Sequence, residues 1–183
     1  MTQKTDKKRQ NNRINDMVLV SLFSAVIAVS AQIAVPLGPI PFTLQTMAVL
    51  VASALLGLKR GVTSVAVYIL LGIVGLPVFS GFRGGIGVLA GPTGGYITAF
   101  LIVGLIVGIS VDKFGRNFSV LILSMLAGLL LCYVFGTLWF VLSTGTDFYS
   151  AFMLCVVPYV IFDLLKIIGS AVLVSRLGKV LML

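Results

Sequence analysis

The sequence predicts an all-α integral membrane protein, built as one bundle of six transmembrane helices with both termini in the cytoplasm. Its 183 residues are 59% hydrophobic and only 10% charged, whereas a soluble domain usually carries about 25% charged residues. The charged residues are too few to cover a water-facing surface of this size. Long apolar runs without strand-like alternation favour helices over a β-barrel, and the positions of the basic residues fit six crossings.

Six apolar runs define the expected helices, and Gly, Pro and charged residues separate them. The runs span approximately residues 17–35, 42–58, 61–77, 94–111, 117–142 and 151–175. A straight membrane span needs about 17–25 residues, so the second and third runs are at the short limit. The polar residues 1–16 contain five basic residues. We expect them to form a disordered cytoplasmic tail near anionic lipid headgroups, ahead of a membrane domain over residues 17–183.

The basic residues set the expected orientation. Eleven of the thirteen lie in the tail, in the connections after the second and fourth runs, and after the sixth run. Six crossings place these four segments on one side of the membrane, and the positive-inside rule makes that side cytoplasmic. The two remaining basic residues, which lie outside these segments, are Arg83 and Lys166. Arg83 is then expected outside, and Lys166 within the membrane.

The outer connections, residues 36–41, 77–95 and 143–150, differ from the short basic inner ones. The first two are rich in Gly and Pro yet largely apolar, so they are poorly suited to being solvated tethers. Irregular backbone at membrane depth is tolerated where it lines a cavity. We therefore expect these loops to fold over the mouth of the bundle as a lid.

Two charges, Asp163 and Lys166, interrupt the last apolar run. A charge at the centre of a membrane helix costs roughly 2.5–3.5 kcal/mol. On a helix these two residues are about 60° and about 4.5 Å apart, so they share a face, which must point into the bundle. They form either an internal ion pair that holds helices together or a polar ligand site. As acceptor and donor they suit a small ligand with adjacent N–H and C=O groups, such as a urea or an amide.

Polar residues and glycines near the outer loops are further candidates for a ligand site. They are Thr43, Gln45, Arg83, Gly91, Thr93, Gly94 and Tyr96. The first two open the second run, where they either hydrogen-bond within the bundle or contact a ligand. The arginine is either solvated or paired with a ligand carboxylate. The last four lead into the fourth run, where they either cap the helix or present N–H groups to an electron-rich group.

Small residues recur along the first run, at Ser21, Ser24, Ala25 and Ala28. Pairs of small residues four apart let two helices approach closely. This face either packs within the bundle or docks onto another membrane subunit.

The usual groups for catalysis are missing. The sequence has no His, no Glu and no phosphate-binding GxxxxGK[ST] motif,. Cys132 and Cys155 lie in apolar runs and are expected to be small buried side chains,. We therefore expect a protein that is not an enzyme and has neither a metal nor a cofactor of its own. Topology explains the net charge of +8, so no nucleic-acid partner is expected.

Four stretches carry a resemblance to a known family. They are 35–46 (VPLGPIPFTLQT), 72–79 (GIVGLPVF), 91–96 (GPTGGY) and 163–166 (DLLK). In this order they resemble the BioY family, the biotin-binding membrane subunits (S-components) of energy-coupling factor (ECF) transporters. Phe82 and residues 160–162 depart from the family pattern, which has more glycine at both places.

The resemblance implies a subunit of a bacterial cell membrane that captures biotin from outside. Its implied partners are a membrane coupling (T) subunit and two ATP-binding subunits, which use the ATP. The ureido ring of biotin is expected near Asp163 and Lys166, its middle near Gln45, Tyr96 and the start of the fourth helix, and its carboxylate near Arg83. The reverse orientation of biotin remains open, as do another vitamin, uncoupled transport and a structural subunit without a ligand.

Overall fold

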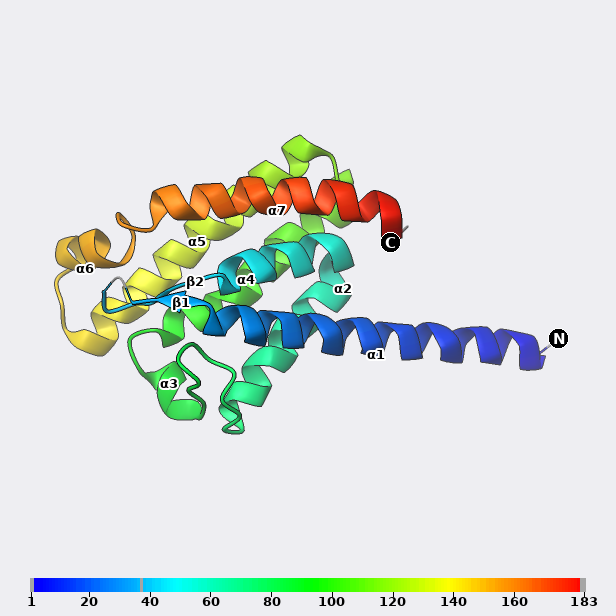
Figure 1. The fold of residues 1–183 in the computed structure, drawn as a ribbon, viewed down its shortest axis with the longest axis horizontal. Coiled ribbons are helices and arrows are strands. Elements are labelled where there is room, and N and C mark those ends of the chain that lie inside the picture. Colours follow the sequence, from blue (N-terminus) through cyan, green and yellow to red (C-terminus); the bar gives the residue numbers. More distant parts are fainter. Residues whose placement is uncertain (1, 37, 182–183) are drawn as a thin grey trace.

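The computed structural model describes the backbone of residues 2–36 and 38–181, with side-chain surroundings for residues 13–36 and 38–178. Seven helices and one two-stranded ribbon are present in this part of the chain (Figure 1). The elements are α1 (Thr2–Gln32), β1 (Ala34–Val35), β2 (Phe42–Thr43), α2 (Gln45–Ile73), α3 (Ile86–Ala90), α4 (Gly94–Phe114), α5 (Phe118–Thr144), α6 (Phe148–Cys155) and α7 (Val160–Leu181).

The amino-terminal helix differs from expectation. α1 begins at Thr2, so the backbone of residues 2–16 is helical, and the expected disordered tail is wrong. Elongating an existing helix is easier than starting one, so the long apolar helix that follows directly favours a helical backbone in residues 2–16. The side chains of the first four basic residues lie outside the described part.

α2 consists of two arms joined at Gly57, whose backbone has φ 73° and ψ −170°. The arms, 45–56 and 58–73, correspond to the second and third apolar runs and diverge in Figure 1. Charged residues from α4 and the turn after it satisfy the backbone at this break. The Asp112 carboxylate accepts a hydrogen bond from the Leu58 N–H (3.1 Å), and the Arg116 guanidinium donates to the carbonyl of Ala54 (2.9 Å).

The last apolar run forms two helices. α6 and α7 are bent by 49° at a short break that contains Pro158. Proline lacks an N–H and cannot continue the hydrogen bonding of α6, so the long helix α7 begins only at Val160. The Asp147 side chain caps α6 by accepting from the Ser150 N–H (2.8 Å). This break places the start of α7 beside the first outer loop, where Tyr159 donates to the Ile40 carbonyl.

The chain is a multi-pass membrane protein by the length and apolarity of its helices. Four described helices are long and apolar enough to cross a membrane: Arg13–Gln32, Gln45–Ile73, Gly94–Phe114 and Phe118–Thr144; the number is five if the bent α6–α7 pair is counted as one span. The helices therefore do not match the six predicted spans one to one, because α2 is continuous through its break and α3 and α6 are short.

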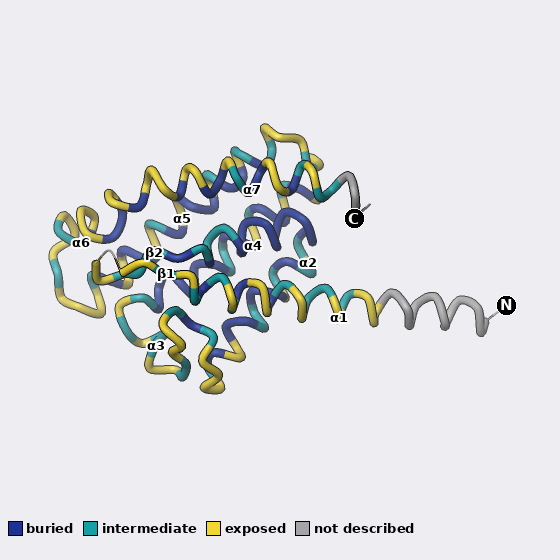
Figure 2. The backbone as a smooth tube through the Cα atoms, viewed as in Figure 1, coloured by how far each residue is buried: buried dark blue, intermediate teal, exposed yellow. Residues whose placement is uncertain are grey.

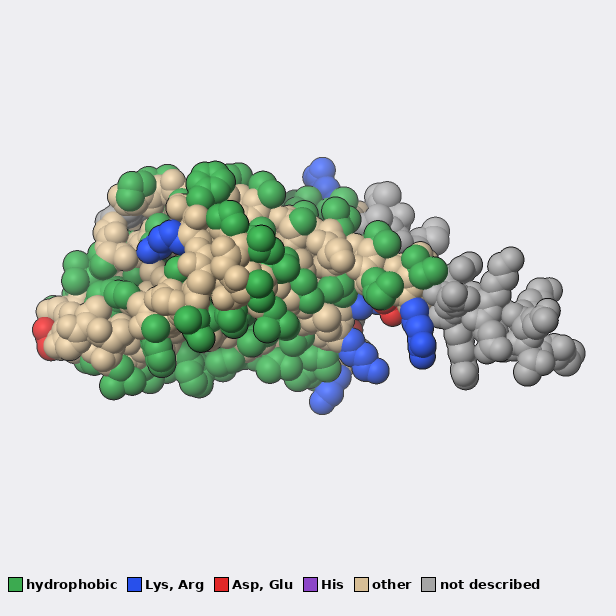
Figure 3. All heavy atoms as spheres, turned by 90° about the horizontal axis from the view of Figure 1, so that it is seen from below, with side chains coloured by type: hydrophobic (Ala, Val, Ile, Leu, Met, Phe, Trp, Pro, Cys, Tyr) green, Lys and Arg blue, Asp and Glu red, His purple; other side chains and the backbone are tan. Residues whose placement is uncertain are grey.

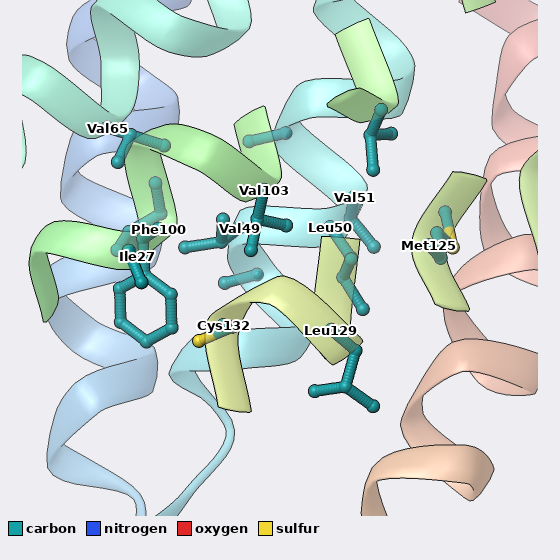
Figure 4. Packing of buried hydrophobic residues seen from close by; sticks show 14 of the residues in the cluster. Ile27, Val49, Leu50, Val51, Val65, Phe100, Val103, Met125, Leu129 and Cys132 are labelled. Carbon is teal, nitrogen blue, oxygen red and sulfur yellow. The ribbon is translucent and has the colours of Figure 1, made fainter. Parts of the chain in front are cut away.

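The core lies along α2 and α4. Buried residues concentrate on these helices, whereas the outer faces of α1, α5 and α7 are exposed (Figure 2). Figure 4 shows Val49 and Leu50 of α2 near Val103 of α4 and Leu129 of α5. Gly128 lets α5 approach α4 closely, since a Cβ there would stand 3.3 Å from Val103. The exposed outer faces carry many large apolar side chains, as a lipid-facing surface requires.

The small residues of α1 divide between two faces. Ser24 is buried, and its hydroxyl lies 2.8 Å from the carbonyl of Ser64 in α2, so this residue packs inside the bundle. It is not available to a partner on the outer surface, contrary to its place in the expected docking face. Ala28 packs partly against the core, whereas Ser21 and Ala25 are exposed.

Gly57→Ala is expected to destabilise the protein more than Gly115→Ala. Both glycines have nearly the same backbone conformation, φ 73° and ψ −170° at Gly57 and φ 79° and ψ −177° at Gly115. This region is almost restricted to glycine, so alanine costs about 1–3 kcal/mol at either site. At Gly57 the added Cβ also overlaps the Asp112 carboxylate, while at Gly115 it meets nothing within 4 Å. Thermal unfolding of the two variants in detergent measures the difference; equal losses would contradict it.

Candidate functional site

A pocket lies beneath the outer loops, between the ribbon β1–β2, the segment 79–88 and helices α2, α4, α5 and α7. Seven of the nine residues proposed for ligand binding line it: Thr43, Gln45, Arg83, Thr93, Tyr96, Asp163 and Lys166. Gly91 and Gly94, at the turn into α4, are not among the lining residues. The fold thus brings together residues that are up to about 120 positions apart in the sequence, as tertiary packing of separate helices requires.

Asp163 and Lys166 form a buried ion pair at the pocket wall. Their exposed fractions are 6% and 7%, and the Lys166 Nζ lies 2.8 Å from the Asp163 Oδ1. Tyr133 of α5 donates its hydroxyl to the other carboxylate oxygen, Oδ2, at 2.6 Å. The Lys166 ammonium also stands 3.9 Å from the centre of the Phe42 ring, an arrangement in which the ring face attracts the cation.

The ion pair and the pocket are parts of one arrangement. Each oxygen of Asp163 accepts one hydrogen bond from the protein, and a carboxylate has about four acceptor positions. The ammonium of Lys166 donates to Asp163 and carries three N–H groups. Both side chains line the pocket and keep hydrogen-bonding capacity for a ligand. The two interpretations of the sequence are therefore compatible.

The first outer loop brings β2 to the pocket. Thr43 pairs with Ala34 in the two-stranded ribbon, which turns the loop back over the bundle. The Thr43 hydroxyl accepts from the Gln45 N–H (3.3 Å), so it holds the turn that leads into α2 and also lines the pocket. The Gln45 side chain donates from Nε2 to the Tyr68 hydroxyl (2.9 Å). Gln45 thus bonds the first arm of α2 to the second and also lines the pocket.

The start of α4 is fixed by hydrogen bonds within the protein. The Gly91 carbonyl accepts from the Gly94 N–H and from the Trp139 Nε1–H, each at 3.0 Å. Gly91 and Gly94 therefore shape the turn into α4, which agrees with the helix-capping interpretation. Tyr96 lines the pocket, and its hydroxyl is hydrogen-bonded to that of Thr137 (2.9 Å).

Arg83 is exposed at the pocket mouth and lies in a tight turn. Phe79 and Arg83 exchange two backbone hydrogen bonds, of 2.9 and 3.2 Å, which close the turn. The Arg83 Nε donates to the Ser80 carbonyl (3.0 Å). Phe82 at the tip has φ 55°, a conformation that glycine adopts more easily. The terminal nitrogens of the guanidinium remain suited to a carboxylate at the mouth.

Several residues that line the pocket were not predicted to do so from the sequence. They are chiefly Tyr133, Phe42, Tyr159, Cys132 and Cys155. The phenol of Tyr133 in an otherwise apolar run was a usable signal, since a polar group at that depth needs a partner. Both cysteines are buried, as expected. No group of three or more metal-ligating side chains is found in the described residues.

Comparison with known proteins gives consistent matches. A family model described as the BioY family matches residues 1–182. The biotin transporter BioY of Thermotoga maritima is 41% identical over 91% of this chain and 97% of its own length. A probable biotin transporter BioY of Pyrococcus horikoshii is 42% identical, over 90% of this chain and 97% of its own.

A solved structure has the same fold. It is described as the S-component for biotin from an ECF-type ABC transporter, and it superposes with a TM-score of 0.86 at 28% identity. The match covers 92% of this chain and 93% of the other. With a family model over nearly its whole length, relatives of similar length and a matching fold, this chain belongs to the BioY family.

Proposed function

We propose that this protein is a biotin-binding S-component of an ECF-type vitamin uptake transporter. It captures biotin from outside and delivers it together with an ATP-driven coupling module. The names of its relatives and of the matching structure support this function. The observation that carries it is the buried Asp163–Lys166 pair in the wall of a pocket beneath the outer loops.

The polar groups of biotin match the two ends of this pocket. The ureido ring offers two N–H groups and one C=O, which suit the carboxylate of Asp163 and the ammonium of Lys166. Tyr133 and Phe42 hold that pair in place. The pair is buried, whereas Arg83 is exposed at the mouth. We therefore place the ureido ring deepest and the carboxylate beside Arg83.

Aromatic and apolar lining residues suit the rest of the ligand. Phe79, Tyr96, Ile97 and Phe100 also line the pocket, and we place the thioether ring and the valerate chain of biotin against them, where they would bury their surface. Burial of apolar surface supplies about 25 cal/mol per Å², and the polar ends fix the orientation.

Substitution of either residue of the Asp163–Lys166 ion pair is expected to weaken biotin binding. Asp163→Asn and Lys166→Ala are each expected to weaken biotin binding at least roughly thirtyfold, because truncating one partner of a buried charge pair costs about 2 kcal/mol or more. Calorimetry, or fluorescence of Trp139, the single tryptophan, measures the dissociation constant. Asp147→Asn, which changes an exposed carboxylate, is the control and is expected to bind biotin normally.

A neutral double variant separates loss of contact from loss of fold. Asp163→Asn with Lys166→Gln removes both charges together, so neither is left buried and unpaired. It is expected to fold and to bind biotin as weakly as the single variants. Wild-type affinity in both single variants would contradict the proposed site.

Six membrane crossings with both termini in the cytoplasm are the topology that we propose. The crossings are α1, the two arms of α2, α4, α5 and the α6–α7 pair. Contacts join the basic segments at one end: Asp16 of α1 pairs with Arg60 of α2 (2.6 Å), and a Cβ at Gly178 of α7 would lie 3.8 Å from the Arg116 side chain. Basic side chains gather toward this end in Figure 3, and a positive end is cytoplasmic.

This topology predicts which cysteines an impermeant maleimide labels in intact cells. Ser143→Cys, exposed in the last turn of α5, is expected to react, whereas Lys113→Cys is expected to react only after permeabilisation. Cys132 and Cys155 are buried, so they give a low background. Labelling of Lys113→Cys in intact cells would overturn the orientation.

The exposed small residues of α1 are the proposed docking face for the coupling (T) subunit. Two ATP-binding subunits complete the proposed complex. Ala25→Trp is expected to leave biotin binding unchanged and to abolish ATP-dependent uptake, because a large side chain prevents close helix approach. Leu123→Trp on the exposed face of α5 is the matched control, with normal binding and uptake. Normal uptake by Ala25→Trp would exclude this face.

A further inference from the structure

Gln32, the last residue of α1, hydrogen-bonds with both ends of its side chain. Its Nε2 lies 3.2 Å from three carbonyl oxygens, those of Ala28, Val78 and Phe79. Its Oε1 accepts from the N–H of Phe82 at 2.9 Å. The amide thus joins α1 to a segment almost fifty residues away, and nothing in its sequence surroundings singled it out.

The segment that Gln32 holds is the tight turn 79–83. Phe82 at its tip is the only non-glycine residue with positive φ in the described chain, and Gly81 before it has φ 72°. Such a conformation persists only where surrounding groups hold it. The Phe82 side chain is 72% exposed, so its own packing contributes little. The hydrogen bond from its N–H to Gln32 is therefore a direct support of the turn.

The turn sets where Arg83 lies relative to the pocket. Phe79, at one end, is fully buried and packs edge-on against Tyr68, with ring centres 5.6 Å apart. Gly72 leaves room for its ring, because a Cβ at that position would overlap it. One end of the turn is thus fixed by packing. The position of Arg83, at the other end, depends on the backbone between them, which Gln32 holds at residues 79 and 82.

We propose that Gln32 is a positioning residue for ligand binding. It is not among the residues that line the pocket, and it acts by fixing the turn 79–83 so that Arg83 meets the carboxylate of the ligand. The inference rests on the biotin site proposed above. A purely structural role for Gln32 would affect every ligand equally, whereas positioning of Arg83 affects only ligands that carry a carboxylate.

The test compares biotin with biotinamide, its neutral carboxamide, in calorimetry of the purified protein. Gln32→Leu is expected to weaken biotin about tenfold, since a charge-assisted hydrogen bond contributes that much or more. Its affinity for biotinamide is expected to change less than twofold, which also shows that the pocket is intact. In an Arg83→Ala background, adding Gln32→Leu is expected to change biotin binding less than twofold, because the positioned group is gone.

Substitutions of Phe82 test the same hydrogen bond from its other side. Phe82→Pro removes the N–H and imposes a φ near −65°, so it is expected to lose affinity for biotin and to keep affinity for biotinamide, as Gln32→Leu does. Phe82→Gly is the matched control. It keeps the N–H and favours positive φ, and it is expected to bind both ligands within twofold of wild type.

Three results would overturn the inference while leaving biotin binding by the wild type established. They are an unchanged biotin affinity in Gln32→Leu and Phe82→Pro, an equal loss for both ligands, and an Arg83→Ala variant that binds biotin as wild type does. Failure of the wild-type protein to bind biotin would instead refute the proposed function.

Discussion

A carboxylate and an ammonium inside a membrane protein must neutralise each other, and the pocket of this chain is arranged around that requirement. Asp163 and Lys166 meet on one face of α7, with Tyr133 of α5 and Phe42 of β2 around them. Removing either charge leaves the other buried and unpaired, at a cost of about 3–5 kcal/mol. The same two groups, paired yet still able to form further hydrogen bonds, are those that we propose contact the ligand.

The outer loops can cover the pocket because their irregular backbone is hydrogen-bonded to side chains of the helices. Backbone groups outside helices must find partners at membrane depth. The Trp139 indole donates to the Gly91 carbonyl, Tyr159 donates to the Ile40 carbonyl, and Gln32 binds the turn 79–83. The first two outer loops are thus held by polar side chains from the surrounding segments, which explains how loops rich in Gly and Pro keep a defined shape.

The charges of the site were predictable because each is an anomaly in its own segment. Asp163 and Lys166 interrupt an apolar run, and Arg83 is the single basic residue of the three outer connections. Tyr133 and Gln32 could not be assigned in the same way, since their roles depend on partners 30 and about 50 residues away. The helical tail and the short α3 were not predicted because the composition of these two segments resembles that of a polar tail and of a Gly-rich loop.

The spacing of the ion pair has a consequence for how the chain enters the bilayer. Asp163 and Lys166 are three residues apart on one helix, so their contact needs only helix formation and no other part of the fold. The two charges can pair as soon as this segment becomes helical, before α7 packs against Tyr133 of α5 and against the ribbon. The last helix can therefore be inserted as a unit of no net charge at this point. Folding of the protein therefore does not require either charge to be exposed to lipid without its partner.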